Sequence, residues 1–212
     1  MKDNFLSNDF TKYLDTMQVD LNEPLDVPLH CNIDINSDVW FEWMTNNWMD
    51  CTTLTYEPRP VHDATSNLQT ELANQLGYHN GNTLKRDWGK YVPHHNDEFK
   101  EIIGDKNFER IGLDPDTVLV RLLCFLPGNI FPVHSDGMEG WKSMFNIDKD
   151  ATRFSVFISP WSWGHYLQIH DNMLTNWKSG DTYIVPSGVM HCSGNGGILP
   201  KVTLTLTGLY DG

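Results

Sequence analysis

Two short stretches, ATRFSVFISP (151–160) and KVTLTLTG (201–208), alternate apolar and polar side chains along most of their length. Successive side chains of a β-strand point to opposite faces, so the alternation predicts two strands that each bury one face. Six more strand candidates, bounded by Pro-Gly, Ser-Gly and Gly-rich turns, lie at 117–128, 129–136, 164–171, 173–177, 181–188 and 189–194. This density of short strands predicts a double-sheet antiparallel fold of the jelly-roll kind. An immunoglobulin-like sandwich is less favoured, because no Cys…Trp…Cys framework is present.

The first half of the chain has a different pattern. VWFEWMTNNWM (39–49) places Trp40, Trp43 and Met44 on one helical face, which predicts a helix packed on the core; an aromatic ligand platform is the alternative. Further helices are expected over 67–77 and 98–104, the second capped by Asn96 or Asp97. We therefore expect one mainly β domain over 1–212, with a helical N-terminal part over about 1–112 and a β core over about 113–212.

Charge and cysteine usage limit the partners and the compartment. The chain of 212 residues has 15 Lys and Arg against 28 Asp and Glu, a formal net charge of −13. An acidic chain repels phosphate backbones, so a nucleic-acid partner is disfavoured, although KRDWGK (85–90) is a local basic cluster. No apolar run is long enough to cross a membrane, and the four cysteines form no CxxC pair. We expect a reduced, cytoplasmic protein with a small molecule or a protein side chain as its substrate.

The sequence His134-Ser135-Asp136 lies at the end of a strand candidate. Side chains at positions i and i+2 of a strand share a face, so the imidazole and the carboxylate converge. His191, just after a Pro-Ser-Gly turn, is the best third ligand, and two histidines with one carboxylate leave three positions of an octahedral metal open. The alternative is a hydrogen-bonded pair at a strand end. A second H-x-D, at 95–97, is interpreted as a helix start.

Two basic residues lie in strand candidates with apolar neighbours. Lys201 opens the last strand, with Thr203 two residues on and on the same face. A lysine inside a barrel is costly unless it meets an anion, so the pair suits a ligand carboxylate; an edge lysine in solvent is the alternative. Arg153 is the second candidate, with a salt bridge at the rim as its alternative.

His134-x-Asp136, His191 and Lys201-x-Thr203, in that order, resemble the 2-oxoglutarate- and Fe(II)-dependent dioxygenases over roughly the last ninety residues. Segments such as WKSGD (177–181) also resemble oxygenase-like proteins of bacteriophages, which implies a cytoplasmic location in an infected host cell. The resemblance implies a cupin-like double-stranded β-helix that holds Fe(II) by the two histidines and the aspartate.

The same resemblance implies how the co-substrates bind. 2-Oxoglutarate would chelate the iron through its 1-carboxylate and 2-oxo group, Lys201 would bind its far carboxylate with help from Thr203, and O₂ would take the remaining position. The implied reaction is hydroxylation, or a related C–H oxidation, coupled to oxidative decarboxylation of 2-oxoglutarate. One subgroup of the family places the anchoring base on an earlier strand, where Arg153 would serve instead.

Residues near 161–166 are candidates for the substrate pocket. The resemblance puts Trp163 and Tyr166 near the cavity mouth, where they could stack on a substrate, and His165 could line the same pocket. A hydrophobic rim with ordinary strand histidines is the alternative.

Two other functions fit parts of the pattern. The first is a cupin-type metalloenzyme without an oxo acid, since Gly128 precedes His134 by six residues and Glu139 follows. That motif expects histidine where Asp136 stands and usually a fourth protein ligand. The second is a non-enzymatic jelly-roll binding module, in which the H-x-D has no metal role.

Overall fold

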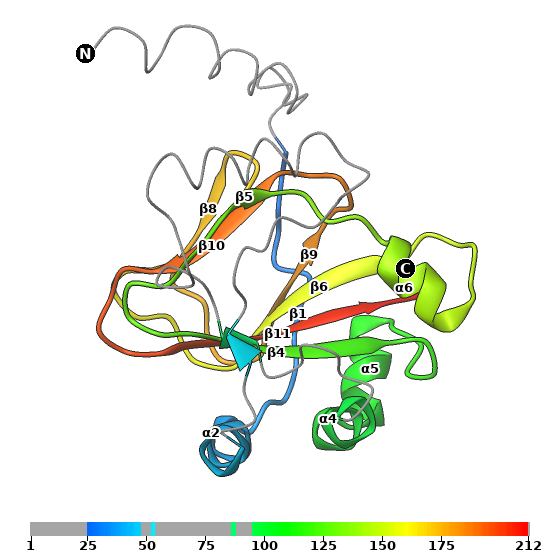
Figure 1. Cartoon of the computed structure of the whole chain (residues 1–212), viewed down its shortest axis with the longest axis horizontal. Helices are drawn as coiled ribbons and strands as arrows, with labels where there is room; N and C mark the ends of the chain where they lie inside the picture. Colours follow the sequence, from blue (N-terminus) through cyan, green and yellow to red (C-terminus); the bar gives the residue numbers. More distant parts are fainter. Residues whose placement is uncertain (1–24, 48–51, 54–85, 88–94, 212) are drawn as a thin grey trace, which may run out of the picture.

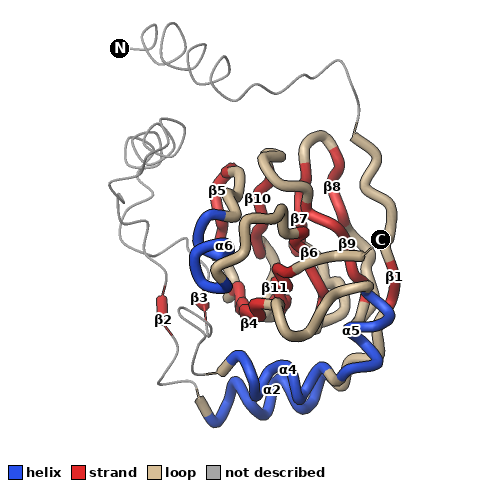
Figure 2. The backbone as a smooth tube through the Cα atoms, turned by 90° about the vertical axis from the view of Figure 1, so that its right-hand side faces the viewer, coloured by secondary structure: helices blue, strands red, loops and turns tan. Residues whose placement is uncertain are grey.

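A computed structural model of the protein shows two antiparallel sheets facing one another, with helices on the outer side of the larger sheet (Figures 1 and 2). The structure describes residues 25–47, 52–53, 86–87 and 95–211, so the expected helix over 67–77 lies outside it. Among the described helices, the longest has ten residues, and none is long and apolar enough to cross a membrane.

The larger sheet has seven strands in the order β1-β9-β6-β11-β4-β3-β2. In that order their bounds are Cys31–Asn32, Asp181–Val185, Thr152–Phe157, Lys201–Gly208, Leu119–Phe125, Arg86–Asp87 and Thr52–Thr53. The smaller sheet has four strands in the order β5-β10-β7-β8. Their bounds are Ile130–His134, His191–Asn195, His165–Ile169 and Asn172–Leu174.

The chain from β4 to β11 passes back and forth between the two sheets. β4, β6, β9 and β11 lie in the larger sheet, whereas β5, β7, β8 and β10 lie in the smaller one, and β11 returns to pair with both β4 and β6. This order is that of a double-stranded β-helix, or jelly roll. The predicted fold class is confirmed, and each of the eight predicted strands overlaps one of these eight strands; β8 begins one residue earlier than predicted and β10 ends one residue later.

Two features differ from the sequence expectation. β1, β2 and β3 come from the part expected to be helical, yet they join the two ends of the larger sheet. Each spans only two residues, which is too short for an alternating pattern to be visible. The helix α6, Glu139–Phe145, lies within the expected β core and is fixed by Trp141, whose Nε1 donates to the carbonyl of Thr117 at 2.7 Å.

Helices α2 (Ser37–Asn46), α4 (Asn96–Ile103) and α5 (Asp105–Ile111) cover the outer face of the larger sheet (Figure 2). Trp40, Trp43 and Met44 are buried in the core, so α2 packs as the helical pattern predicted and offers no aromatic platform. On β11, the outward residues Val202, Leu204 and Leu206 join this core. The other face of β11, with Lys201, Thr203, Thr205 and Thr207, therefore points between the two sheets.

Asn96 joins α4 to the larger sheet instead of capping the helix. Its buried amide donates to the carbonyl of Val118 at 3.1 Å and accepts from the amide of Val120 at 2.9 Å. The expected cap at Asn96 or Asp97 is therefore wrong; the cap position is His95, which makes no side-chain capping bond. The bonds of Asn96 satisfy backbone groups beside β4 that would otherwise be buried without partners.

We predict that Asn96→Ala lowers the free energy of unfolding by about 2–3 kcal/mol, because it leaves two buried backbone groups unpaired. Urea denaturation measures this loss. Glu101→Ala, on the exposed side of the same helix, is the control and should change stability by less than about 0.5 kcal/mol. Equal stabilities of the two variants would contradict this role for Asn96.

Candidate metal centre

The antiparallel pairing of β5 with β10 brings two histidines together. His134 ends β5 and His191 begins β10, and the register sets them directly opposite each other. Their ring centroids are 4.2 Å apart, and the Phe131 ring packs edge-on against His134 at 4.1 Å. A β-bulge between His191 and Ser193 interrupts the pairing next to the histidines, a frequent device for aiming a side chain at a site.

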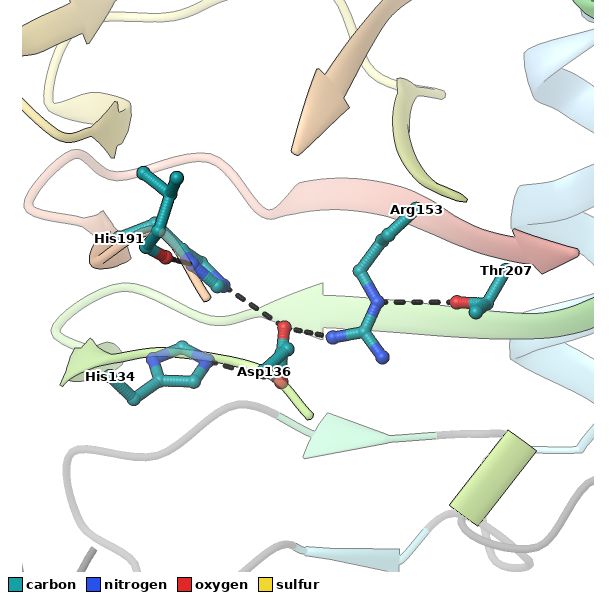
Figure 3. Close-up of polar contacts among 6 residues, drawn as sticks. His134, Asp136, Arg153, His191 and Thr207 are labelled. Atoms are coloured by element: carbon teal, nitrogen blue, oxygen red, sulfur yellow. Dashed lines mark hydrogen bonds and ion pairs between the residues drawn. The ribbon is translucent and has the colours of Figure 1, made fainter. Parts of the chain in front are cut away.

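Asp136 completes the cluster from the loop that follows β5 (Figure 3). One carboxylate oxygen, Oδ2, lies 3.1 Å from His191 Nε2, and the other, Oδ1, lies 3.8 Å from His134 Nε2. One donor atom from each of these residues lies within 4.8 Å of the other two. The structure thus brings together all three residues that the sequence singled out as metal ligands.

The donor set fits a divalent metal ion. His191 Nδ1 is 2.9 Å from the carbonyl of Val189. A carbonyl only accepts, so Nδ1 carries the proton and Nε2 of the neutral ring keeps its lone pair for a metal. That lone pair faces a carboxylate oxygen, which is also an acceptor, and a cation between them makes the contact favourable. Two imidazoles and one carboxylate are the donors of a three-ligand centre with open positions.

The cluster lies on a cavity between the two sheets. The cavity wall carries hydroxyl, guanidinium and apolar groups beside the cluster, and Asp136 is the one carboxylate among its described residues. The described lining residues are Arg121, Leu123, Phe125, Phe131, His134, Asp136, Arg153, Ser155, Leu167, Val185, His191, Ser193, Thr203 and Thr205. The cavity is therefore rich in positive charge, which favours an anionic ligand.

Lys201 is completely buried beside the cavity. Its ammonium donates to the carbonyl of Tyr166 and to Ser193 Oγ, and it lies 4.8 Å from the centre of the Phe125 ring. Burial lowers the pKa of this ammonium to about 7. Among the described residues no acid forms an ion pair with Lys201, and Ser193, Phe125 and the neighbouring Thr203 all line the cavity. A buried cation without a counter-charge is costly, so the site suits an anion.

Arg153 has a different setting from Lys201. It forms an ion pair with Asp136, and its Nε donates to Thr207 Oγ1 at 3.2 Å (Figure 3). Burial, together with the charge of Arg121, lowers the pKa of Arg153 to about 10, so the guanidinium stays protonated at neutral pH. The alternative role for Arg153, a salt bridge at the rim, thus corresponds to a contact with one of the candidate metal ligands.

The three candidate pocket residues lie away from this cavity. Trp163 is 83 % exposed, and Tyr166 lies on the outer face of β7, where its ring covers Gly194. His165 is buried, but its Nε2 faces the carbonyl of Leu199 at 2.9 Å, and burial lowers its pKa. His165 pairs with Asn195, four residues along β10 from His191, which corresponds to about 13 Å. The position of this segment at the far end of β10 explains the difference from the expectation.

Arg121 was missed at the sequence level. It lies within the predicted strand 117–128, among apolar residues, and it lines the cavity together with Thr205 of the neighbouring β11 and Ser155 of β6, one strand further on. The same signal that pointed to Arg153, a charged residue in an apolar strand, could have found it.

The fold and this cluster together define a double-stranded β-helix with a candidate three-ligand metal centre. Neither a protein-family model nor a curated protein matches the chain. Among solved structures, one similar chain is an uncharacterized conserved protein with a double-stranded β-helix domain from Klebsiella pneumoniae, at 18 % identity. The match covers 43 % of this chain and 66 % of that one, with a TM-score of 0.31.

Two further solved structures are similar to parts of the chain. A predicted oxalate decarboxylase from Thermotoga maritima is 14 % identical, over 50 % of this chain and 76 % of that one, with a TM-score of 0.32. A cupin 2 conserved barrel domain protein from Salinispora arenicola is 11 % identical, over 44 % and 64 %, with a TM-score of 0.30. Matches with such low sequence identity and TM-score support no functional inference. The strand order alone identifies the fold.

We predict that the protein binds one divalent ion such as Co²⁺ and that His191→Ala weakens this binding at least about 100-fold, because one of three ligands is lost. Isothermal titration of the metal-free protein measures the affinity. His170→Asn is the control: His170 follows β7 in a left-handed conformation that asparagine tolerates, and it is not part of the cluster. Equal affinities of His191→Ala and wild type would contradict the assignment of the site.

Proposed function

We propose that the protein is an Fe(II)- and 2-oxoglutarate-dependent oxygenase that couples oxidative decarboxylation of 2-oxoglutarate to hydroxylation, or a related C–H oxidation, of a second substrate. The observation that carries the proposal is the combination of three metal-ligating side chains with a buried, acid-free Lys201 beside one cavity. A three-ligand centre leaves room for a chelating oxo acid and for O₂.

The residues of the cavity have distinct roles under this proposal. His134, Asp136 and His191 hold the iron, which when bound supplies the redox chemistry that links O₂ to the two oxidations. Lys201 binds the far carboxylate of 2-oxoglutarate: its ammonium has three N–H donors, of which two go to Tyr166 and Ser193, and one is left for an anion.

The spacing along β10 supports this assignment of Lys201. Ser193, which Lys201 contacts, lies two residues beyond His191, or about 6.6 Å along the strand. An extended dicarboxylate can therefore have one end at the histidines and the other near the ammonium. Thr203, two residues from Lys201 on β11, also lines the cavity, and under this proposal its hydroxyl assists Lys201. Arg153 is less suited as the anchor, because it pairs with Asp136 at the metal ligands themselves.

A cupin-type metalloenzyme without an oxo acid is the second candidate. The strand order fits it equally well, but this class usually adds a fourth protein ligand. In the described part of the chain, the metal-binding cluster has three members, and one is an aspartate. Binding of the oxo acid separates the two candidates.

We expect a weak visible charge-transfer band when Fe(II) and 2-oxoglutarate are both added to the protein without oxygen, because the chelate brings an oxo group to the metal. The band should be absent with either component alone and in His134→Ala. In Lys201→Met, the 2-oxoglutarate concentration for half-maximal absorbance should rise about 10- to 100-fold, since a charge-assisted hydrogen bond is lost.

Lys142→Met removes a lysine that pairs with Asp150 at the surface and is the matched control, with unchanged affinity. Metal binding without the band would favour the cupin-type function. A band whose midpoint is unchanged in Lys201→Met would remove Lys201 as the anchor while leaving the reaction class in place.

The burial of Lys201 also predicts a pH-dependent stability. Its pKa is about 7 in the folded protein against an ordinary 10.5, so the unfolded chain binds more protons between these values and stability rises with pH across this window. Near pH 6 the full cost of the buried charge is present, and Lys201→Met should be more stable than wild type by about 1–4 kcal/mol. Ser193 Oγ and the Tyr166 carbonyl bond to each other at 3.3 Å, so the substitution leaves neither without a partner.

Urea unfolding of the metal-free protein at pH 6, 7, 8 and 9 tests this. The stability advantage of Lys201→Met should shrink as the pH rises above 7. Parallel stability curves for wild type and variant would show that Lys201 is not a buried cation in the folded protein.

A further inference from the structure

Arg153 connects the candidate metal centre to the centre of the larger sheet. Its Nη1 pairs with Asp136 Oδ2, and its Nε donates to Thr207 Oγ1 at 3.2 Å (Figure 3). The side chain is only 15 % exposed, and Asp136 is 26 % exposed. The contact is therefore a largely buried, charge-assisted pair, which is stronger than a surface ion pair.

The position of Arg153 is fixed by the sheet. Arg153 lies on β6 between two hydrogen-bonded neighbours, opposite Thr207 of β11 on one side and Val185 of β9 on the other. The bond from Nε to Thr207 restricts the planar guanidinium further, because the donors of its fork have fixed directions. The strand pairing and the contact with Thr207 thus restrict the Arg153 side chain, which directs Nη1 toward the loop after β5.

Asp136 has no comparable support from its own element. It follows β5 in a loop, and its backbone carbonyl accepts one long bond, 3.5 Å, from the amide of Gly188. Among the described residues, Arg153 is the partner of its carboxylate outside the two histidines. The orientation of the carboxylate therefore depends on the guanidinium.

The two carboxylate oxygens have different surroundings. Oδ2 contacts both Arg153 Nη1 and His191 Nε2, the latter at 3.1 Å, whereas Oδ1 faces His134 Nε2 at 3.8 Å. The guanidinium therefore holds the carboxylate in an orientation in which each oxygen faces one of the two histidines.

We propose that Arg153, itself held by Thr207, is a positioning residue that fixes the orientation of the Asp136 carboxylate toward the metal centre. This inference rests on the metal centre of the proposed function. It adds two residues of adjacent strands, Arg153 of β6 and Thr207 of β11, that together orient one of the metal ligands. Residues that orient metal ligands commonly change metal affinity 10- to 100-fold when they are replaced.

The test is a titration of the metal-free protein with Co²⁺, followed by the visible absorption of the bound ion, which reports the number and arrangement of ligands. In Arg153→Met, the dissociation constant should rise about 10- to 100-fold and the spectrum should change, because the released carboxylate is no longer held in one orientation toward the metal. Arg153→Lys keeps the charge without the planar fork and should restore only part of the affinity.

The second position supplies a milder variant and a matched control. Thr207→Val removes the bond to Nε and should weaken Co²⁺ binding in the same direction by a smaller factor, about 3- to 10-fold. In the Arg153→Met background it should add nothing, since Thr207 acts through Arg153. Thr152→Val makes the same change on β6 beside Arg153, at a residue that pairs with Gly208 and is not among the described residues that line the cavity, and it should leave both affinity and spectrum unchanged.

The outcomes separate the inference from the proposed function. Wild-type affinity and spectrum in both Arg153→Met and Thr207→Val would overturn the positioning role while leaving the metal site intact. Failure of the wild-type protein to bind Co²⁺ would overturn the metal site and the positioning role together. If Arg153→Met does not fold, as judged by thermal unfolding of the metal-free protein, Thr207→Val and Arg153→Lys decide the matter. An effect of Thr152→Val equal to that of Thr207→Val would show a general disturbance of the sheet and would also overturn the positioning role.

Discussion

The two-residue alternation of β11 is the constraint on which the rest of the structure depends. Its outward residues, Val202, Leu204 and Leu206, are apolar and are buried in the core that includes the helices. Burial of this apolar surface requires that this face of β11 lie against the helices. The side chains of the alternate residues of β11 then point into the space between the two sheets. Lys201 is buried at one end of this row and Thr207 at the other, so a packing requirement on one face determines where the polar groups of the other face lie.

The same strand connects the end of the cavity near the candidate metal centre with the end near Lys201. β11 pairs with β4 and β6 along most of its length, and these two strands contribute Arg121 and Arg153 to the cavity wall. Cations in this interior are costly, and stability alone does not account for them. They are understandable if the cavity is built to hold a metal carboxylate and an anionic ligand, which is the function proposed here.

Much of this arrangement is predictable from local sequence patterns. Period-two alternation and turn residues locate the eight core strands. The i, i+2 spacing of His134 and Asp136 predicts that their side chains lie on the same face and converge. The pairing of His134 with His191 rests on a register that no local pattern contains. The ion pair of Arg153 with Asp136 likewise depends on how β6 faces the loop after β5. The inward or outward direction of Tyr166 follows from its strand phase, but the phase is known only once its neighbours are placed.

The order of the strands has a consequence for synthesis of the chain. β11 lies in the middle of the larger sheet, yet it is made after every other described strand. Until it emerges, β4 and β6 have no partner on their facing edges, and the apolar side of the helices has no central strand to cover it. The larger sheet therefore cannot close until these residues have left the ribosome, and until then the growing chain carries exposed strand edges, which are sites of aggregation.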